Sequence, residues 1–232
     1  VTDGVMVARG DLGLEVPLER VPRIQKDIAR RAQMLGRPVI VATQVLESMR
    51  EEPRPTRAEV SDAATAVDQG VDAIMLAGET AVGTNPIRAV RTLDLIIREA
   101  ETIPIVEPLE PAVDPTRSGH GRAICEAAIT LAARGSADAI VAVTRGGKTA
   151  RLLSALRPGA TIYGATDDDL VARRLALSWG VVPLVCALGD VPTVQREIAA
   201  LGALPSGSVV VFVSVSPDLS RSDANFLNLK RL

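Results

Sequence analysis

Three short apolar runs set the pattern of the first hundred residues. Residues 5–8, 38–42 and 73–76 are nearly continuously apolar rather than alternating, which is typical of strands buried on both faces. They recur at intervals of roughly 34 residues. Between the first two runs, apolar residues fall at helical spacing, and Gly36 stands where a C-terminal helix cap is expected. The residues at helical spacing are Val21, Ile24, Ile28, Ala32 and Leu35. This pattern predicts one βα unit.

The same unit is predicted twice more. Thr56 followed by Glu59 has the spacing of a capping box, so a second helix is expected to begin there and to end at Gly70. Asn85 before Pro86 predicts a cap and a first helical position for a third helix. Three βα units cannot close a barrel that needs eight strands. We therefore expect open strand edges that need further units, a partner chain or another cover.

A stretch rich in proline and acidic residues separates this region from the rest. Residues 104–118 lack sustained periodicity and predict a linker between a first domain, 1–103, and a second domain, 119–232. In the second domain helices and strands alternate: helices at 122–134, 149–156, 168–177 and 193–201, and strands at 139–143, 161–165, 181–186, 208–215 and 226–229. The fold class predicted is α/β: a partial (β/α)8 barrel of three βα units, followed by a doubly wound, mostly parallel sheet with an added edge strand.

Composition narrows the class of protein. The chain has 232 residues, 47% of them hydrophobic, which excludes a disordered chain. A net charge of -2 gives no broad field for a polyanion, so no nucleic-acid partner is expected. The longest apolar run, 181–188, is shorter than the roughly 20 residues that span a bilayer, so no membrane segment is expected. Cys125 and Cys186 lie in apolar segments and predict buried free thiols and a cytoplasmic location. The chain opens at Val1 directly into a strand, which suggests a chain cut in mid-fold.

Polar residues gather at the ends of the three predicted strands. After the first strand, Ala8, Arg9, Gly10 and Asp11 begin a glycine turn whose amides suit a carboxylate or phosphate, and whose Asp11 suits Mg²⁺. Thr43 follows the second predicted strand, and Glu79 follows the third. Taken alone, Asp11 also fits a helix cap, Thr43 a structural residue and Glu79 a carboxylate near a helix start. Three such clusters at successive strand ends favour a site, because barrel sites are built from several strands.

These stretches, in their order, resemble pyruvate kinases. Residues 3–13 are similar to the sixth barrel strand of that family and its loop, and residues 38–48 to the seventh strand. Residues 53–62, Pro-Arg-Pro-Thr-Arg-Ala-Glu-Val-Ser-Asp, match a family signature almost without change. The resemblance continues more loosely to the last residue.

The resemblance implies phosphoryl transfer from phosphoenolpyruvate to ADP, giving pyruvate and ATP in glycolysis. It implies that the amides of Gly10 and Asp11, with Ala8 and Arg9, bind phosphoenolpyruvate, and that Asp11 binds Mg²⁺ or Mn²⁺. Thr43 is implied to contact the substrate near the carbon that is protonated, with Glu79 as a second catalytic candidate. The catalytic Lys, the second metal carboxylate and the K⁺ ligands of the family are expected outside this chain. We therefore expect no activity from the isolated chain.

One substitution departs from the family pattern in the first domain. Ala77 stands where family members usually carry Ser before Gly-Glu. By the resemblance, that Ser belongs to the polar network on the side of the site that delivers the proton. The loss of its hydroxyl is expected to weaken protonation.

The second domain carries a candidate effector loop, formed by Thr144, Arg145, Gly146, Gly147, Lys148 and Thr149. Its amides, hydroxyls and basic residues precede a predicted helix and favour an anion. It is not a complete P-loop, because Ala142 stands where the motif requires Gly. The resemblance implies a sugar-phosphate or nucleotide effector there, although Gly146 replaces a Ser that many members have. The alternative is a tight βα turn that binds nothing.

Two other functions remain open. The chain fits a non-catalytic module that senses a phosphorylated metabolite and oligomerises through its second domain. It also fits one half of a split kinase, whose earlier strands come from another polypeptide. The family further implies a homo-oligomer, a tetramer in its full-length members.

Overall fold

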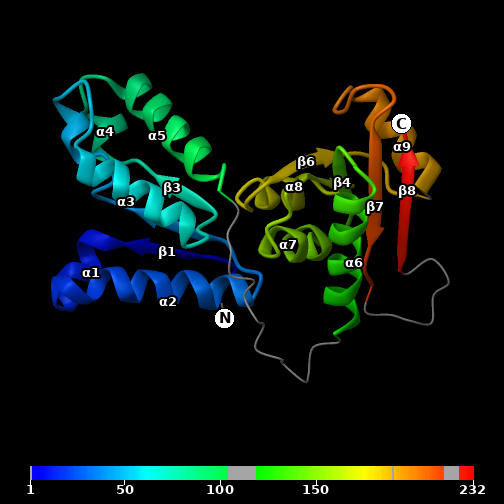
Figure 1. Cartoon of the computed structure of the whole chain (residues 1–232), viewed down its shortest axis with the longest axis horizontal. Coiled ribbons are helices and arrows are strands. Elements are labelled where there is room, and N and C mark those ends of the chain that lie inside the picture. The colour runs from blue at the N-terminus through cyan, green and yellow to red at the C-terminus, as the bar shows by residue number, and fades with distance from the viewer. Residues whose placement is uncertain (1, 104–118, 190, 217–224) are drawn as a thin grey trace. The chain divides into compact units, whose positions relative to one another are not determined.

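The computed structural model describes residues 2–103, 119–189, 191–216 and 225–232 (Figure 1). Contacts divide the chain into two compact units, Val1–Glu110 and Pro111–Leu232. The expected linker, 104–118, lies outside the described residues, so its predicted boundaries stay a prediction.

The first unit is a parallel sheet with helices after each strand. In the described residues the sheet has the order β1-β2-β3, formed by Val5–Ala8, Val39–Ala42 and Ala73–Met75. Val7 pairs with Val41 and Val41 with Ile74, both in parallel register. The main helices are α2 (Val21–Met34), α3 (Arg57–Asp68) and α5 (Pro86–Ala100), and the shorter ones are α1 (Arg9–Glu15), η1 (Leu18–Arg20), η2 (Glu47–Arg50) and α4 (Gly78–Ala81). The three predicted βα units are confirmed.

The predicted helix ends are largely confirmed by their hydrogen bonds. Gly36 follows α2 with φ 61°, and Gly70 follows α3 with φ 77°, a conformation that glycine adopts without steric cost. Thr56 and Glu59 form the predicted capping box at the start of α3. Asn85 is the N-cap residue of α5 and Pro86 its first residue, as predicted. The Asn85 side chain, however, makes no cap hydrogen bond to α5, and its amide donates to Thr84 Oγ1 at 2.9 Å.

Helices cover one face of this sheet. Val7, Val39 and Val41 point to that face and pack in a core cluster with Ala29 of α2 and Ala66 of α3. Figure 1 shows α2 running alongside β1. Met6 and Met75 belong to the opposite face by the strand register, and they are 53% and 40% exposed. In the part of the chain that the structure describes, the outer edges of β1 and β3 are unpaired, as expected from the sequence. The opposite face is partly exposed, at Met6 and Met75.

The second unit is a sheet of the order β6-β5-β4-β7-β8 in the described residues, with β8 antiparallel to β7 and the other pairs parallel. Its elements are α6 (His120–Arg134), β4 (Ala139–Val143), α7 (Lys148–Ala155), β5 (Thr161–Thr166), α8 (Asp169–Leu175), β6 (Val181–Val185), α9 (Val191–Ala200), β7 (Val209–Ser214) and β8 (Phe226–Arg231). Alternate residues of β4 face two cores: Ile140 packs with α6 and α7, and Val141 packs with α9. The doubly wound sheet with an added edge strand is confirmed.

Both cysteines are buried free thiols, as predicted. Burial raises the pKa of Cys125 to about 12 and raises the pKa of Cys186 as well. Thiolate, the reactive form, is therefore scarce at both positions near neutral pH. Separately, none of the helices in the described ranges combines the length and the apolar character that crossing a bilayer requires.

Candidate active site

The segment predicted as a glycine turn is a helix. α1 runs from Arg9 to Glu15, directly after β1, and neither Gly10 nor Gly13 is among the residues with positive φ. Packing decides this, because Leu12 joins the core cluster around Val7 and thereby favours a helix over the local preference of glycine. The first amides of α1 therefore lie at the carboxyl end of β1, the same edge at which β2 and β3 end.

A direct hydrogen bond joins the ends of β1 and β2. The backbone N–H of Gly10 donates to Thr43 Oγ1 at 2.9 Å. The two residues come from positions that are 33 apart in the sequence, and the parallel register of β1 and β2 brings them together. The structure thus places two of the predicted site residues in contact. The Gly10 amide, which is expected to bind substrate, donates instead to the Thr43 hydroxyl.

Thr43 lies in a strained turn. Thr43 and Gln44 have φ values of 68° and 52°, although neither is glycine. A left-handed conformation costs a residue with a β-carbon on the order of 1–3 kcal/mol, and it persists only where the surrounding structure holds it. Such outliers are concentrated at functional sites, so the strain itself marks this turn as a candidate.

Arg9 supplies the contacts that hold the turn. Its side chain is only 9% exposed. Nε and Nη2 donate to the carbonyl of Thr43 at 3.2 and 2.9 Å, and Nη2 also donates to the carbonyl of Gln44 at 2.8 Å. Nη1 forms an ion pair with Asp62 of α3. The guanidinium thus points into the protein, and its expected contact with substrate stays a prediction.

Glu79 is also directed inward. It is 1% exposed, and its two carboxylate oxygens accept the backbone N–H of Leu46 at 3.0 Å and of Ala77 at 2.8 Å. The first of these belongs to the loop after β2 and the second to the turn after β3. Glu79 therefore ties two strand ends together, and its proposed catalytic role remains untested.

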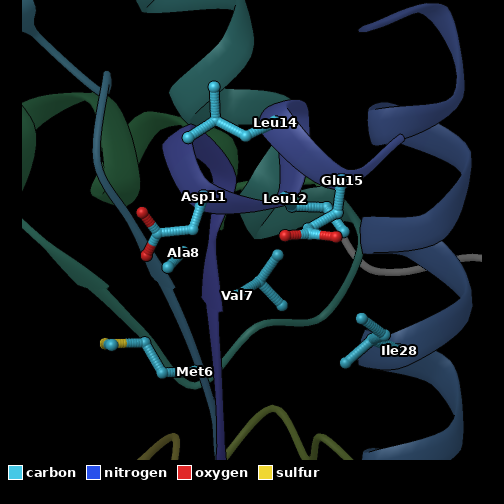
Figure 2. Close-up of a pocket in the computed structure, with 8 residues that line it drawn as sticks. All are labelled: Met6, Val7, Ala8, Asp11, Leu12, Leu14, Glu15 and Ile28. Atoms are coloured by element: carbon cyan, nitrogen blue, oxygen red, sulfur yellow. The ribbon is translucent and has the colours of Figure 1, made fainter. Parts of the chain in front are cut away.

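Asp11 is exposed beside an open hollow of about 500 Å³ along β1. Figure 2 shows the carboxylate of Asp11 on one side of α1, with Ala8 and Met6, and the carboxylate of Glu15 on the other side. The hollow is lined by Met6, Val7, Ala8, Asp11, Leu12, Leu14, Glu15 and Ile28. The two carboxylates do not converge on one point.

The described residues contain no group of three or more His, Cys, Asp or Glu side chains that could hold a metal ion. Mg²⁺ prefers near-octahedral oxygen ligation and is commonly held by one or two carboxylates together with substrate phosphates and water. Asp11 can therefore serve as one ligand of a Mg²⁺ ion whose other ligands come from substrate, water or further residues.

The candidate effector loop lies between β4 and α7. Arg145, Gly146 and Lys148 are exposed, whereas Thr144 and Thr149 are buried. Thr149 Oγ1 accepts the N–H of Val215 at 3.3 Å, which links the loop to the end of β7. Gly147 has φ 77° and caps α7. The exposed groups of the loop are therefore the side chains of Arg145 and Lys148 at the start of α7. Thr149 instead stabilises the fold through its hydrogen bond with Val215.

Sequence reasoning missed two residues of this arrangement. Asp62 is the last residue of the quoted signature at 53–62, and that position was the available signal. Leu46 contributes only a backbone amide, for which a sequence offers no signal.

Comparisons with known proteins give the family. The chain matches the model "Pyruvate kinase, barrel domain" over residues 1–90 and the model "Pyruvate kinase, alpha/beta domain" over residues 122–229. A pyruvate kinase of Clostridium acetobutylicum is 47% identical over 236 residues, which cover 99% of this chain and 50% of that protein. A pyruvate kinase of Corynebacterium glutamicum is 43% identical over 235 residues, which cover 99% of this chain and 49% of that protein.

The chain thus spans about half the length of these curated relatives. The two family models follow one another along the chain in the order of its two units, and between them they match most of its length. The chain belongs to the pyruvate kinase family.

Proposed function

We propose that this chain supplies part of the active site of a pyruvate kinase, which transfers a phosphoryl group from phosphoenolpyruvate to ADP and yields pyruvate and ATP. The observation that carries the proposal is the contact between Gly10 and Thr43 at adjoining strand ends, beside the exposed carboxylate of Asp11. Barrel enzymes assemble their sites at this edge of the sheet.

The residues have distinct proposed roles. The amides at the start of α1, from Gly10 and Asp11, hold the carboxylate of phosphoenolpyruvate, with Ala8 and Arg9 shaping that end of the site. For this, the Gly10 amide exchanges its hydrogen bond to Thr43 Oγ1 for one to the substrate. Asp11 contributes one ligand to Mg²⁺ or Mn²⁺. Thr43 lies near the carbon that takes up the proton. When bound, the metal ion supplies charge neutralisation for the transferring phosphoryl group.

The remaining groups of the site are proposed to come from residues outside the described strands. These groups are the catalytic Lys, a second metal carboxylate and the K⁺ ligands. The 232-residue chain alone is then expected to form no pyruvate from phosphoenolpyruvate and ADP above a heat-denatured control. Pyruvate formation by the purified chain would contradict this part of the proposal. If a separately expressed chain bearing the preceding half of the Clostridium acetobutylicum relative restored the activity, the split-kinase arrangement would be favoured.

A fused enzyme tests the roles directly. In it, the half of the Clostridium acetobutylicum relative that precedes the matched region continues into residues 1–232 of this chain. Asp11→Asn should raise the Mg²⁺ concentration needed for half-maximal activity by at least about ten-fold, since it removes a charged ligand. Asp27→Asn is the matched control, because Asp27 is exposed on α2, where it forms an ion pair with Arg31. An equal Mg²⁺ requirement in both variants would overturn the role of Asp11.

A second candidate function is favoured by the effector loop. We propose that Arg145, Gly146 and Lys148 bind the phosphate of a sugar-phosphate or nucleotide effector at the start of α7, with Thr144, Gly147 and Thr149 shaping the loop. Calorimetric titration of the chain with fructose bisphosphate, sugar monophosphates and AMP tests this. Lys148→Ala should abolish saturable binding, whereas Arg134→Ala, an exposed site at the end of α6, should not. Absence of binding to every compound would favour a turn that binds nothing.

The family resemblance also supports a cytoplasmic homo-oligomer as part of this proposal. Light scattering on the fused enzyme tests the oligomeric state, for which a tetramer is expected. A monomer at micromolar concentration would contradict it.

A further inference from the structure

The turn at Thr43 and Gln44 needs stabilising contacts from residues outside the turn. Both residues adopt left-handed conformations that side chains rarely tolerate, and such conformations persist only where neighbouring groups impose them. The hydroxyl of Thr43 also has to stay within reach of the Gly10 amide, at 2.9 Å. The shape of this turn therefore decides where the Thr43 side chain points.

These stabilising contacts come from the buried side chain of Arg9. Arg9 donates to the carbonyls of both turn residues through Nε and Nη2, so its guanidinium bridges the two strained peptides. The guanidinium is a planar fork whose donors have a fixed geometry. Once Arg9 is fixed in its plane, the carbonyls of Thr43 and Gln44 are fixed too.

The orientation of Arg9 depends in turn on a residue outside the candidate site. Asp62, in the first half of α3, pairs with Nη1, the guanidinium nitrogen that makes none of the contacts with the turn. A guanidinium that is 9% exposed needs a counter-charge, because an unpaired buried charge is strongly unfavourable. Asp62 is itself 41% exposed, so its own burial does not explain its position.

We propose that Asp62 is a positioning residue, which acts through Arg9 to hold the Thr43–Gln44 turn in its left-handed conformation and so aims the Thr43 hydroxyl at the end of β1. The arrangement links α3, β1 and the loop after β2 in one chain of contacts. Its consequence for phosphoryl transfer rests on the proposed function. Its consequence for the geometry of the turn does not.

Amide hydrogen exchange of the full 232-residue chain, followed residue by residue by NMR, tests the proposal without reference to activity. In Asp62→Ala the amide of Gly10 should exchange at least about ten-fold faster, and the chemical shifts of Thr43 and Gln44 should move. Asp62→Asn should show a smaller change, since its amide oxygen still accepts from Arg9. Asp68→Asn, an exposed site on the same helix, should show none.

Two results would overturn the proposal. One is a Gly10 amide that exchanges at the wild-type rate in folded Asp62→Ala. The other is an equal acceleration at all amides of the first unit, which means that Asp62 only stabilises the fold. If Asp62→Ala does not fold, Asp62→Asn decides by the same two readouts.

The fused enzyme separates this proposal from the proposed function. There, Asp62→Asn should lower kcat with little change in KM for phosphoenolpyruvate, because Thr43 is assigned to the step after substrate binding. If KM rises while kcat stays constant, the positioning of Thr43 is contradicted. If the unaltered fused enzyme is inactive, the proposed function fails, and the exchange rates alone decide the role of Asp62.

Discussion

For single residues at the strand ends, the sequence predicts membership of the candidate site better than it predicts the direction and burial of the side chain. Thr43 and Asp11 could be predicted as site candidates, because each follows an apolar run and parallel strands end at a common edge. The inward direction of Arg9 and the burial of Glu79 could not be predicted. Their partners, Asp62 and Leu46, lie 53 and 33 residues away along the chain, and only the packing of α3 and of the loop after β2 brings them close.

Glu79 offers a prediction about stability. Glu79→Gln leaves one oxygen to accept an amide and turns an NH₂ group toward the second N–H donor. An unsatisfied buried donor costs about 1–3 kcal/mol, so the free energy of unfolding should fall by that amount. Urea denaturation of the chain measures it. Glu52→Gln, at an exposed position, is the control, and equal losses in both variants would show that the two amide contacts contribute nothing specific.

At the scale of elements, the helices with strong end signals were predicted best. The capping box at Thr56 and the glycines after α2 and α3 are local features, and the structure has them as expected. The glycines of α1 predict a turn, whereas the structure has a helix there. Its helical state depends on Leu12 reaching the core and on Thr43 accepting the Gly10 amide, which are contacts between segments that a local pattern does not contain.

The start of α3 should depend on pH through Glu59. Its carboxylate accepts from the backbone N–H and the hydroxyl of both Ser48 and Thr56. Burial by itself raises the pKa of Glu59. The hydrogen bonds from Ser48 and Thr56 together lower the pKa by more than burial raises it, so the pKa lies below the ordinary value of 4.5. A lowered pKa in the folded state adds stability above the pKa of the unfolded state, and that stability is lost as the pH falls through the folded value.

We therefore expect the urea midpoint of the chain to fall as the pH drops below 4.5, and to fall less in Glu59→Gln. Urea titrations of both proteins over a series of pH values measure the difference. A Glu52→Gln variant, whose carboxylate is exposed, should follow the unaltered chain. Parallel pH dependence in the unaltered chain and Glu59→Gln would contradict the stabilising role of the Glu59 carboxylate.

At the scale of the whole molecule, the two units differ in how fully the described helices cover the faces of their sheets. The sheet of the second unit has helices on both faces, with separate cores on either side of β4. The sheet of the first unit exposes Met6 and Met75 on one face. The order of strands and helices predicts the fold class, and the number of strands predicts open edges. The exposure of Met6 and Met75 on one face is seen only in the structure.

This exposed face predicts self-association of the isolated chain. Apolar sheet faces and open edges promote contacts between copies, so light scattering should increase with concentration. Met6→Gln combined with Met75→Gln should reduce this association. Leu95→Gln, which alters an apolar residue 67% exposed on α5, is the control. Association that responds equally to both changes would place the contact elsewhere on the first unit.

We propose that the ends of β1 and β2 belong to a site that transfers a phosphoryl group from phosphoenolpyruvate. The most direct measurement is the rate of pyruvate formation by the fused enzyme from phosphoenolpyruvate and ADP. We expect a Mg²⁺-dependent rate that Thr43→Ala lowers by at least about ten-fold and that Thr65→Ala, on the exposed side of α3, leaves unchanged. A folded fused enzyme that forms pyruvate no faster than its denatured control would contradict it.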